Sequence, residues 1–327
     1  MENNSNKVAA FFKNEMMIFV LIALCVVFGI INPVFLDPKN LLNICTQNAY
    51  FIIATTGIAM IMISGGTDLS VGNLMSVVGI VMALSLTVAY LPTPVAILIG
   101  VIVGVGLGMF NGFIANLFNI HPMIVTLATM TMFSGLSYTL SNSQSFFDFP
   151  EDFIGIGQGY VGPISIPIIL FIIVVVIFSF IMSKTVFGRF IYAVGGNPEA
   201  AHLAGIKVKK IKLMVFAIAG GLFALADIVL ISRAGSAKSD MGVSTTFDGI
   251  TACVLGGVSF IGGEGKIRGA LVGCLILGVL SNGMQLAGMG VYAQNIVKGA
   301  ILIASIGMDT IQRNAKLKVK KTKAAAA

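Results

Sequence analysis

Charged residues are scarce in this sequence, and their scarcity excludes most soluble architectures. Only 10% of the 327 residues are Asp, Glu, Lys or Arg, whereas 57% are apolar and the mean hydropathy is +0.99. Soluble domains carry about 25% charged residues, so this chain cannot build an ordinary water-facing surface. We therefore expect an integral membrane protein. At about 20 residues per span plus short connections, the length suggests about ten crossings.

The residues that usually form catalytic or metal centres are also few. The four cysteines show no metal-ligand or CxxC spacing and are interpreted as small hydrophobes. The only two histidines, His121 and His202, lie far apart in the sequence. A P-loop is absent, because Gly263–Ile267 resembles only the end of that motif and lacks its hydroxyl ligand for magnesium. We therefore expect no enzyme activity, no catalytic residue, no cofactor and no metal.

Ten apolar runs are long enough to be membrane helices, which predicts an all-α polytopic fold. They cover residues 16–36, 44–64, 70–90, 94–118, 123–141, 164–183, 211–231, 246–261, 267–288 and 291–310. The eighth is short and rich in glycine, so its boundary is the weakest. This pattern divides the chain into an N-terminal segment 1–15, a transmembrane domain 16–311 and a basic tail 312–327.

Basic residues indicate the orientation of these spans. With the N-terminus inside, 16 of the 20 lysines and arginines fall on inner segments. The positive-inside rule then places both termini in the cytoplasm. The outer loops hold only Lys39, Arg233 and Lys238, and loop 142–163 carries acidic residues alone. Lys298 lies near the outer end of the last span, where its stem could extend toward the interface. The net charge of +7 thus reflects topology and predicts no nucleic-acid binding.

A weak internal repeat relates the two halves of the chain. Asn111-Gly112 recurs as Asn282-Gly283 at an offset of 171 residues, and Asp68–Gly72 resembles Asp240–Ser244 at an offset of 172. Matches this short can also arise by chance. A true repeat would relate spans one to five to spans six to ten. Because five is odd, the two halves would be inverted, as in many transporters, with the pathway at their interface.

Glycines recur at four-residue spacing inside two spans. Gly104, Gly108 and Gly112 share one face of the fourth span, and Gly269 and Gly273 share one face of the ninth. Such a face lets neighbouring backbones approach closely. Tight helix packing is one interpretation, and a pathway wall that shifts between two packings is the other.

The segment 64–72, Ser-Gly-Gly-Thr-Asp-Leu-Ser-Val-Gly, interrupts the second and third spans. Thr67, Asp68 and Ser70 are good N-cap residues, so a helix is expected to restart near Leu69. The segment is either a tight turn with a capping aspartate or a broken helix near a pathway. A broken helix is tolerated only where protein or water covers its backbone.

The longest predicted cytoplasmic loop, 184–212, contains a short helix with strong boundary signals. Asn197 is an N-cap, Pro198 occupies the first helical position, Glu199 lies in the first turn, and Gly205 is placed as a C′ stop. A helix of about two turns is unstable alone in water, so something must dock against it. An ordinary surface helix of the protein itself is the alternative.

From Asn40 to Ile311 the chain resembles the permease family of ribose-type monosaccharide ABC importers, with branched-chain amino-acid permeases as distant relatives. The segments that carry this resemblance are SGGTDLSVGNLMSVVG (64–79), NGFIANLFNIHPMIVTLATMTMFSGL (111–136), FGRFIYAVGGNPEAAHLAGIKV (187–208), VLGGVSFIGGEGKIRGALVG (254–273) and LSNGMQLAGMGVYAQNIVKGAILI (280–303).

The resemblance implies a protein of the bacterial inner membrane with two inverted five-helix halves. It also implies three kinds of partner: a second permease subunit (the same chain or a paralogue), cytoplasmic ABC ATPases and an extracytoplasmic sugar-binding protein. The residues that would dock the ATPase are Asn197, Pro198, Glu199, Ala200, Ala201, Leu203 and Gly205.

A sugar pathway needs uncharged hydrogen-bonding groups, and a few polar residues lie in or beside the spans. The pathway candidates are Asp68, Asn73, Asn111, Asn282 and Gln285. These side chains could equally join helix to helix. The solute could be ribose, another sugar, a nucleoside or a similar molecule. An ion-coupled secondary transporter remains the rival from another class, and Asp227, where a small residue is expected, is the only clear candidate for its ionisable relay.

Overall fold

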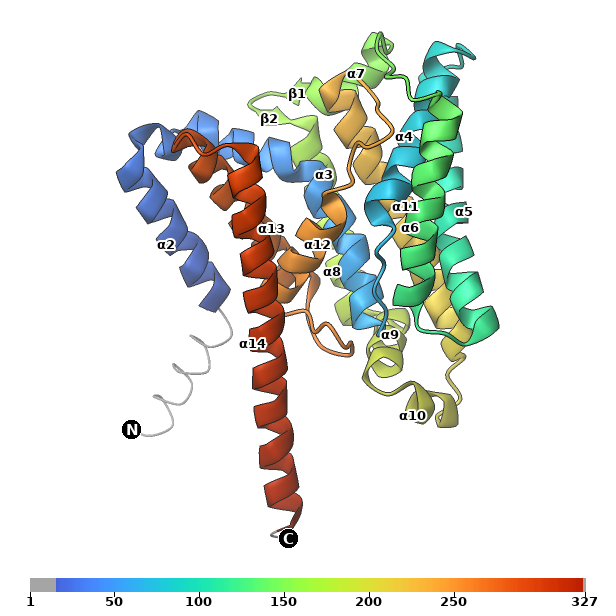
Figure 1. Cartoon of the computed structure of the whole chain (residues 1–327), viewed down its shortest axis with the longest axis vertical. Coiled ribbons are helices and arrows are strands. Elements are labelled where there is room, and N and C mark those ends of the chain that lie inside the picture. The colour runs from blue at the N-terminus through green and yellow to red at the C-terminus, as the bar shows by residue number, and fades with distance from the viewer. Residues whose placement is uncertain (1–15, 326–327) are drawn as a thin grey trace.

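A computed structural model describes the backbone of residues 16–325 and the side chains of residues 17–311 (Figure 1). The predicted segment 1–15 and the side chains of the tail 312–327 lie outside the described residues. The elements, in order, are α2 (Met16–Ile31), η1 (Pro33–Leu36), α3 (Pro38–Ile63), α4 (Val71–Thr87), α5 (Thr93–Phe118), α6 (Pro122–Ser141), α7 (Glu151–Gln158), β1 (Tyr160–Val161), β2 (Ile164–Ser165), α8 (Ile166–Lys184), α9 (Val186–Gly196), α10 (Pro198–Leu203), α11 (Val208–Ala234), α12 (Thr245–Leu255), α13 (Ile267–Leu286) and α14 (Val291–Ala325).

Each predicted apolar run coincides with a helix. Within the described residues, seven helices are long and apolar enough to cross a membrane: α3, α5, α6, α8, α11, α13 and the first part of α14. Four others, α2, α4, α9 and α12, are shorter and apolar. The chain is therefore a mostly helical, polytopic membrane protein.

Several boundaries differ from the prediction. The eighth run ends as a helix at Leu255 rather than at residue 261, because Gly256 is followed by Gly257 in the left-handed region at φ 79°. The third predicted span begins as helix α4 at Val71, and the side chain of its N-cap residue Ser70 makes no capping hydrogen bond. Sequence inspection also missed the helix α7 and the small antiparallel pair β1–β2 inside loop 142–163.

The helices of the two halves pack in matching pairs. α3 lies against α11, α5 packs along α11, and α13 packs along α3. Likewise α4 packs on α6, and α12 packs on α14. In Figure 1 the chain descends through α3 toward α9 and rises through α11 toward α7, so these two central helices run in opposite directions. We call the two ends of the bundle the α10 end and the α7 end.

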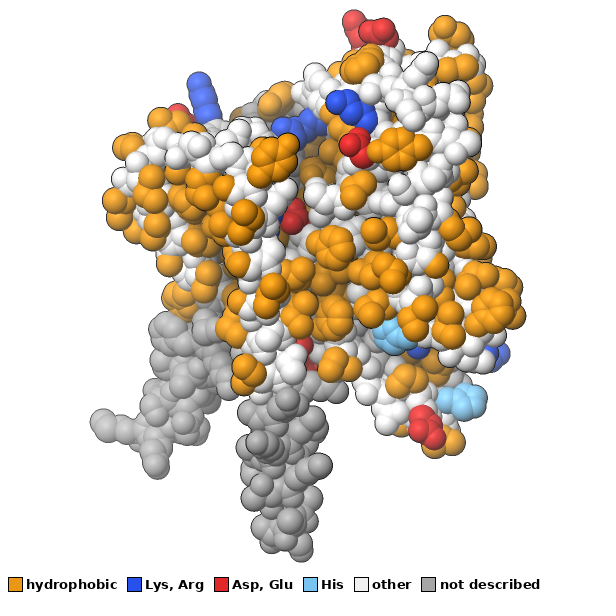
Figure 2. Space-filling model, viewed as in Figure 1, with side chains coloured by type: hydrophobic (Ala, Val, Ile, Leu, Met, Phe, Trp, Pro, Cys, Tyr) orange, Lys and Arg blue, Asp and Glu red, His pale blue; other side chains and the backbone are white. Residues whose placement is uncertain are grey.

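The centre of the bundle is buried on all sides, whereas the outer helices are not covered. Every residue from Phe51 to Ile63 in α3 is buried, as expected of a helix enclosed by others. By contrast, α5, α6 and α8 leave large apolar side chains exposed, among them Leu98, Ile102 and Val176. Figure 2 shows mostly hydrophobic side chains between the two ends. Such apolar outer faces are suited to contact with the hydrocarbon core of a lipid bilayer.

The glycine faces lie at the closest helix contacts. A Cβ built on Gly108 would lie 2.3 Å from the backbone oxygen of Phe216, and one built on Gly104 would lie 2.6 Å from that of Gly220. A Cβ built on Gly112 would lie 3.0 Å from the Cβ of Phe216. In the other half, Gly269 and Gly273 approach the backbone oxygens of Gly256 and Ala252 in the same way. These positions let α5 approach α11, and α13 approach α12, almost backbone to backbone.

Candidate functional site: the docking loop and the two helix breaks

The short helix α10 is capped at both ends as the sequence predicted. Asn197 accepts a hydrogen bond on Oδ1 from the N–H of Ala200 at 2.9 Å. At the other end the N–H of Gly205, which has φ 84°, donates to the oxygen of His202, and the N–H of Ile206 donates to that of Ala201. This pair of bonds is a Schellman motif. The local structure predicted for this segment is therefore confirmed.

The surface of α10 is largely uncovered by the rest of the chain. Ala201 is buried, whereas Pro198, Glu199, Ala200 and Leu203 are exposed. Leu203 is 84% exposed. Two turns of helix gain little stability by themselves, so the caps and Ala201 hold α10 in place while its outer side stays free.

Backbone-to-backbone contacts join the docking loop to the centre of the bundle. The N–H of Gly263 donates to the oxygen of Ile63 at 2.9 Å. A Cβ on Gly195 would lie 1.8 Å from that same oxygen, and one on Gly262 would lie 2.5 Å from the Cα of Gly65. We call Gly65, Gly195, Gly262 and Gly263 the glycine junction. Within it, the end of α9 touches both the end of α3 and the loop between α12 and α13.

A side-chain bond reinforces the glycine junction. The hydroxyl of Tyr192 in α9 donates to the oxygen of Gly265 at 2.8 Å. Burial raises the pKa of Tyr192, so this hydroxyl keeps its proton and remains a donor at neutral pH. α9 is thereby held to the loop that follows α12 by a side chain as well as by its backbone.

The segment 64–70 is a buried break in the chain, and its Asp68 accepts hydrogen bonds from Ser70 as the capping aspartate of the first interpretation would. All of its residues are buried or half-buried. Oδ1 of Asp68 accepts hydrogen bonds from the N–H of Ser70 at 2.8 Å and from its hydroxyl at 2.7 Å. Asn111 in α5 donates to the same hydroxyl at 2.8 Å. Protein therefore covers this irregular backbone.

The start of α4, directly after the segment 64–70 (the first helix break), meets the segment 235–244 between α11 and α12, which we call the second helix break. The N–H of Gly72, at the start of α4, donates to Oγ1 of Thr246, at the start of α12, at 2.9 Å. Ser76 donates to the oxygen of Met241 at 2.7 Å. A Cβ on Gly72 would lie 2.6 Å from the oxygen of Gly242. The two short helices α4 and α12 thus begin side by side.

The pathway candidates separate into two groups. Asp68 and Asn111 belong to the break, and Asn73 donates to the oxygen of Met130 in α6 at 2.7 Å. Asn282 exchanges hydrogen bonds with Asn40 at 2.9 and 3.1 Å. Three of the five candidates, Asn73, Asn111 and Asn282, therefore join separate segments of the chain. The hydrogen bonds of Asp68 stay within the break, and Gln285 makes no such link in the contacts described.

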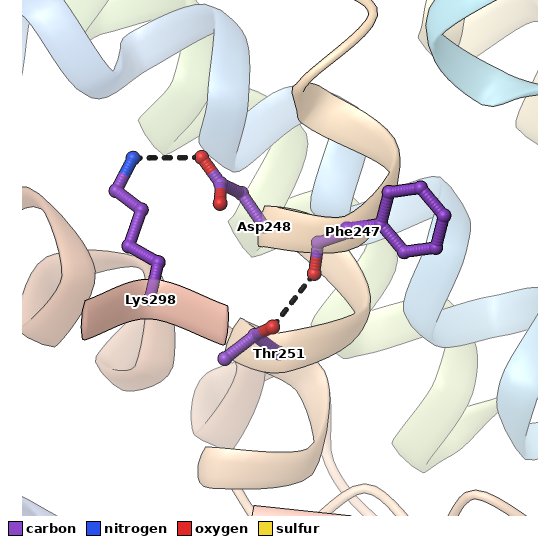
Figure 3. Close-up of polar contacts among 4 residues, drawn as sticks. All are labelled: Phe247, Asp248, Thr251 and Lys298. Carbon is purple, nitrogen blue, oxygen red and sulfur yellow. Dashed lines mark hydrogen bonds and ion pairs between the residues drawn. The ribbon is translucent and has the colours of Figure 1, made fainter. Parts of the chain in front are cut away.

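Asn282 and Gln285 line a cavity of about 330 Å³ between α3, α11, α12, α13 and α14. Its wall also contains Arg233 and an ion pair between Asp248 and Lys298, whose Oδ2 and Nζ lie 2.8 Å apart. Figure 3 shows Asp248 on α12 and Lys298 on α14 pointing toward one another. Their side chains are only 22% and 21% exposed, respectively, so the pair is largely withdrawn from solvent.

Of two charged residues singled out in the sequence, Lys298 differs from the expectation, and Asp227 faces the bundle interior. Lys298 does not extend alone toward the interface but pairs with Asp248, which sequence inspection overlooked. Opposite charges in two neighbouring spans were the available signal, because an intramembrane charge usually has a partner. Asp227 lies inside the bundle with 0% exposure, facing Gly79, and neither of its oxygens has a hydrogen-bond partner among the described residues.

A bundle with apolar outer faces and two facing helix breaks belongs to the class of polytopic membrane transport proteins. Comparison with known sequences identifies the family. Residues 40–306 match the family described as the permease component of the branched-chain amino acid transport system. The chain belongs to this permease family.

Several relatives cover nearly all of the chain. It is 35% identical to the ribose import permease protein RbsC of Haemophilus influenzae, over 97% of this chain and 99% of that protein. It is 40% identical to the ribose import permease protein RbsC of Bacillus subtilis, over 88% of this chain and 90% of that protein. It is 34% identical to the D-allose transport system permease protein AlsC of Escherichia coli, over 90% of each. No solved structure gives a significant match.

Family membership confirms several predictions together. The relatives are permease subunits of sugar importers and are not enzymes themselves, and such permeases reside in the inner membrane. The predicted resemblance to monosaccharide ABC importer permeases is thereby confirmed. Membership of this family implies an ATPase and a substrate-binding protein as partners.

Proposed function

We propose that this chain is the membrane-spanning subunit of an ABC importer that carries a monosaccharide, ribose or a close relative, inward by alternating access. The names of the relatives support the solute: ribose, allose and galactose permeases all align over at least 88% of this chain. A nucleoside or another solute with a ring of hydroxyl groups is the alternative within the same mechanism.

The proposed topology has ten spans in two inverted halves of five, with both termini in the cytoplasm. The matching helix pairs and the opposite directions of α3 and α11 support the inversion. α2 begins and α14 ends at the α10 end of the bundle (Figure 1). That end also holds the basic residues Lys184, Arg189, Lys266 and Arg268, which the positive-inside rule assigns to the cytoplasm.

The glycine junction is the observation that best supports energy transfer from a partner. In this proposal an ATPase pair grips the exposed side of α10, and its closure moves α9 with α10. Because Gly195 touches the backbone at Ile63, and Gly263 bonds to the same oxygen, a displacement of α9 reaches the first helix break and the loop between α12 and α13 without a flexible side chain between them. Packed backbones transmit such shifts because they are poorly compressible.

The proposed solute path runs from the cavity at the α7 end past the two breaks, and a second permease subunit completes it. Asn282, Gln285 and the charges around them supply donors and acceptors for hydroxyl groups. Asp68, Asn73 and Asn111 shape the breaks rather than bind the solute tightly. Weak binding suits a path that releases its cargo, since the sugar-binding protein supplies the affinity.

Reconstitution tests the proposal directly. The chain is placed in vesicles with its candidate ATPase and sugar-binding protein, and uptake of labelled ribose is measured. We expect uptake that requires ATP and both partners. Uptake by the chain alone, driven by a proton or sodium gradient, would establish the secondary transporter instead.

A paired variant tests the docking role of α10. Glu199→Lys with Gly205→Pro reverses the charge in the first turn and breaks the Schellman motif, because proline cannot adopt φ 84°. We expect co-purification of the ATPase to be lost while membrane insertion is kept. Asp152→Lys with Gly162→Pro makes the matched change at the α7 end, where Gly162 has φ 61°. Equal retention of the ATPase by both variants would contradict the docking role.

A further inference from the structure

A basic groove lies beside the docking helix. It is formed by the end of α5, the start of α6, α10 and the start of α11, and its volume is about 820 Å³. The residues of the groove that carry or can carry charge are Lys207, Lys209, Lys210, Lys212, His121, His202 and Glu199. Asn116 of α5 donates to the backbone oxygen of Lys209 at 2.8 Å, which ties the two walls of the groove together.

The positive charge of the basic groove is not neutralised by the described part of the chain. Glu199 is the one carboxylate among the residues that line it. The single ion pair found among the described side chains is that of Asp248 and Lys298, elsewhere in the molecule. Partial burial and the charge of Lys212 lower the pKa of His121, which is the response expected of a histidine in a positive potential. An anion is therefore the ligand that the groove favours.

The surface next to the groove is apolar. At the end of α5, Leu117 and Phe118 are 54% and 63% exposed, and near the start of α6, Ile124 is 59% exposed. Both helices are long and apolar enough to cross a membrane. A ligand in the groove thus contacts positively charged side chains that can bind phosphate on one side. On the other side it contacts exposed apolar side chains of helices that are expected to lie in the membrane. A phospholipid has both parts, whereas free phosphate and an acidic peptide lack the apolar one.

We propose that the basic groove binds the phosphate headgroup of an anionic phospholipid, whose acyl chains lie along α5 and α6. Basic pockets between membrane helices on the cytoplasmic side bind such headgroups in other proteins. Only the assignment of the groove to the inner leaflet rests on the proposed function. Because α10 forms one wall, the lipid contacts the helix proposed to dock the ATPase, and the lipid composition of the membrane affects how firmly that helix is held.

The test compares two triple variants with the same change of charge. The groove variant is Lys207→Gln, Lys209→Gln and Lys210→Gln, all exposed positions. The control variant is Lys184→Gln, Lys266→Gln and Arg268→Gln, also exposed and at the same end but outside the groove. Each purified chain is placed in phosphatidylcholine nanodiscs that contain increasing phosphatidylglycerol, and retained lipid is counted by native mass spectrometry. Both leaflets hold the same mixture, so the result does not depend on the orientation of the chain.

We expect the groove variant to bind phosphatidylglycerol at least about tenfold more weakly than the wild type, since each lysine near an anionic lipid contributes roughly a fivefold effect. The control variant should retain wild-type binding. Thermal unfolding measures whether each variant is folded. If the groove variant does not fold, the single change Lys210→Glu replaces it.

Three results would overturn the proposal. An equal loss in both triple variants would show general attraction to the membrane surface. Displacement of the lipid by millimolar inorganic phosphate, with no preference for the intact phospholipid, would show a site for free anions. Unchanged lipid binding, together with a loss of ATPase association in the groove variant alone, would assign the groove to an acidic segment of the partner.

Discussion

Adding one methyl group to the glycine junction should separate the docking loop from the first helix break. In Gly195→Ala the new Cβ would lie 1.8 Å from the oxygen of Ile63 and 2.8 Å from the nitrogen of Gly263. Neither neighbour is the end of a flexible side chain. The adjacent change, Gly196→Ala, is a matched control, because a Cβ there meets nothing within 4 Å.

The magnitude follows from the clash and from the bond that shares the same oxygen. Real Cβ atoms essentially never approach closer than 3.0 Å, so α9 must move by more than 1 Å. Overpacking of this kind costs about 1–3 kcal/mol. Weakening the bond from Gly263 to Ile63 costs about 1 kcal/mol more. The helical preference of alanine over glycine offsets roughly 0.5–1 kcal/mol, which leaves Gly195→Ala less stable by about 1–3 kcal/mol.

Two measurements on the purified protein check this reasoning. Thermal unfolding in detergent should show a lower midpoint for Gly195→Ala and an unchanged or slightly higher one for Gly196→Ala. ATP-dependent uptake should fall in Gly195→Ala although the ATPase still co-purifies, because the caps of α10 are untouched. If the two variants unfold and transport alike, the backbone contact at the glycine junction does not carry the coupling.

Three further predictions concern the helices around the breaks. Gly108→Ala should destabilise the permease by about 1–2 kcal/mol, because its Cβ meets the Phe216 backbone, whereas Gly106→Ala, which meets nothing within 4 Å, should not lower the unfolding midpoint. Lys298→Gln should lower the free energy of unfolding by roughly 1–3 kcal/mol, less than breaking a fully buried pair. In a double-mutant cycle, adding Asp248→Asn should recover most of that loss of stability. Asp227→Asn should leave ATP-dependent uptake intact, and its complete loss would favour an ion-coupled carrier.

Much of the fold was predictable from local patterns. Apolar runs became helices because a membrane span must satisfy its backbone hydrogen bonds within itself. Prolines marked the starts of α3, α6 and α8, since a helix tolerates proline in its first turn. The caps of α10 at Asn197 and Gly205 were equally local, because each satisfies backbone groups a few residues away. The elements missed, α7 and the β1–β2 pair, are too short and too polar for the apolar pattern to indicate.

The candidate site was less predictable, because its contacts join distant segments. Four-residue spacing placed Gly104 and Gly108 on one helix face, but not against which neighbour. Among the polar candidates, sequence could not separate those that hold the chain together from Gln285, which faces a cavity. The ion pair of Asp248 with Lys298 likewise needed the neighbouring positions of α12 and α14.

The amino-acid order alone is therefore enough for the membrane class, the helices and the capped helix of the docking loop, because each depends on hydropathy or on hydrogen bonds within a few residues. The glycine junction depends instead on the tertiary packing of distant segments. Gly65, Gly195 and Gly263 come from three separate parts of the chain, and a glycine carries no side chain whose chemistry would indicate a partner. Only the packed bundle shows that their backbones touch, and that α9, which leads into α10, is joined to the first break and to the loop between α12 and α13.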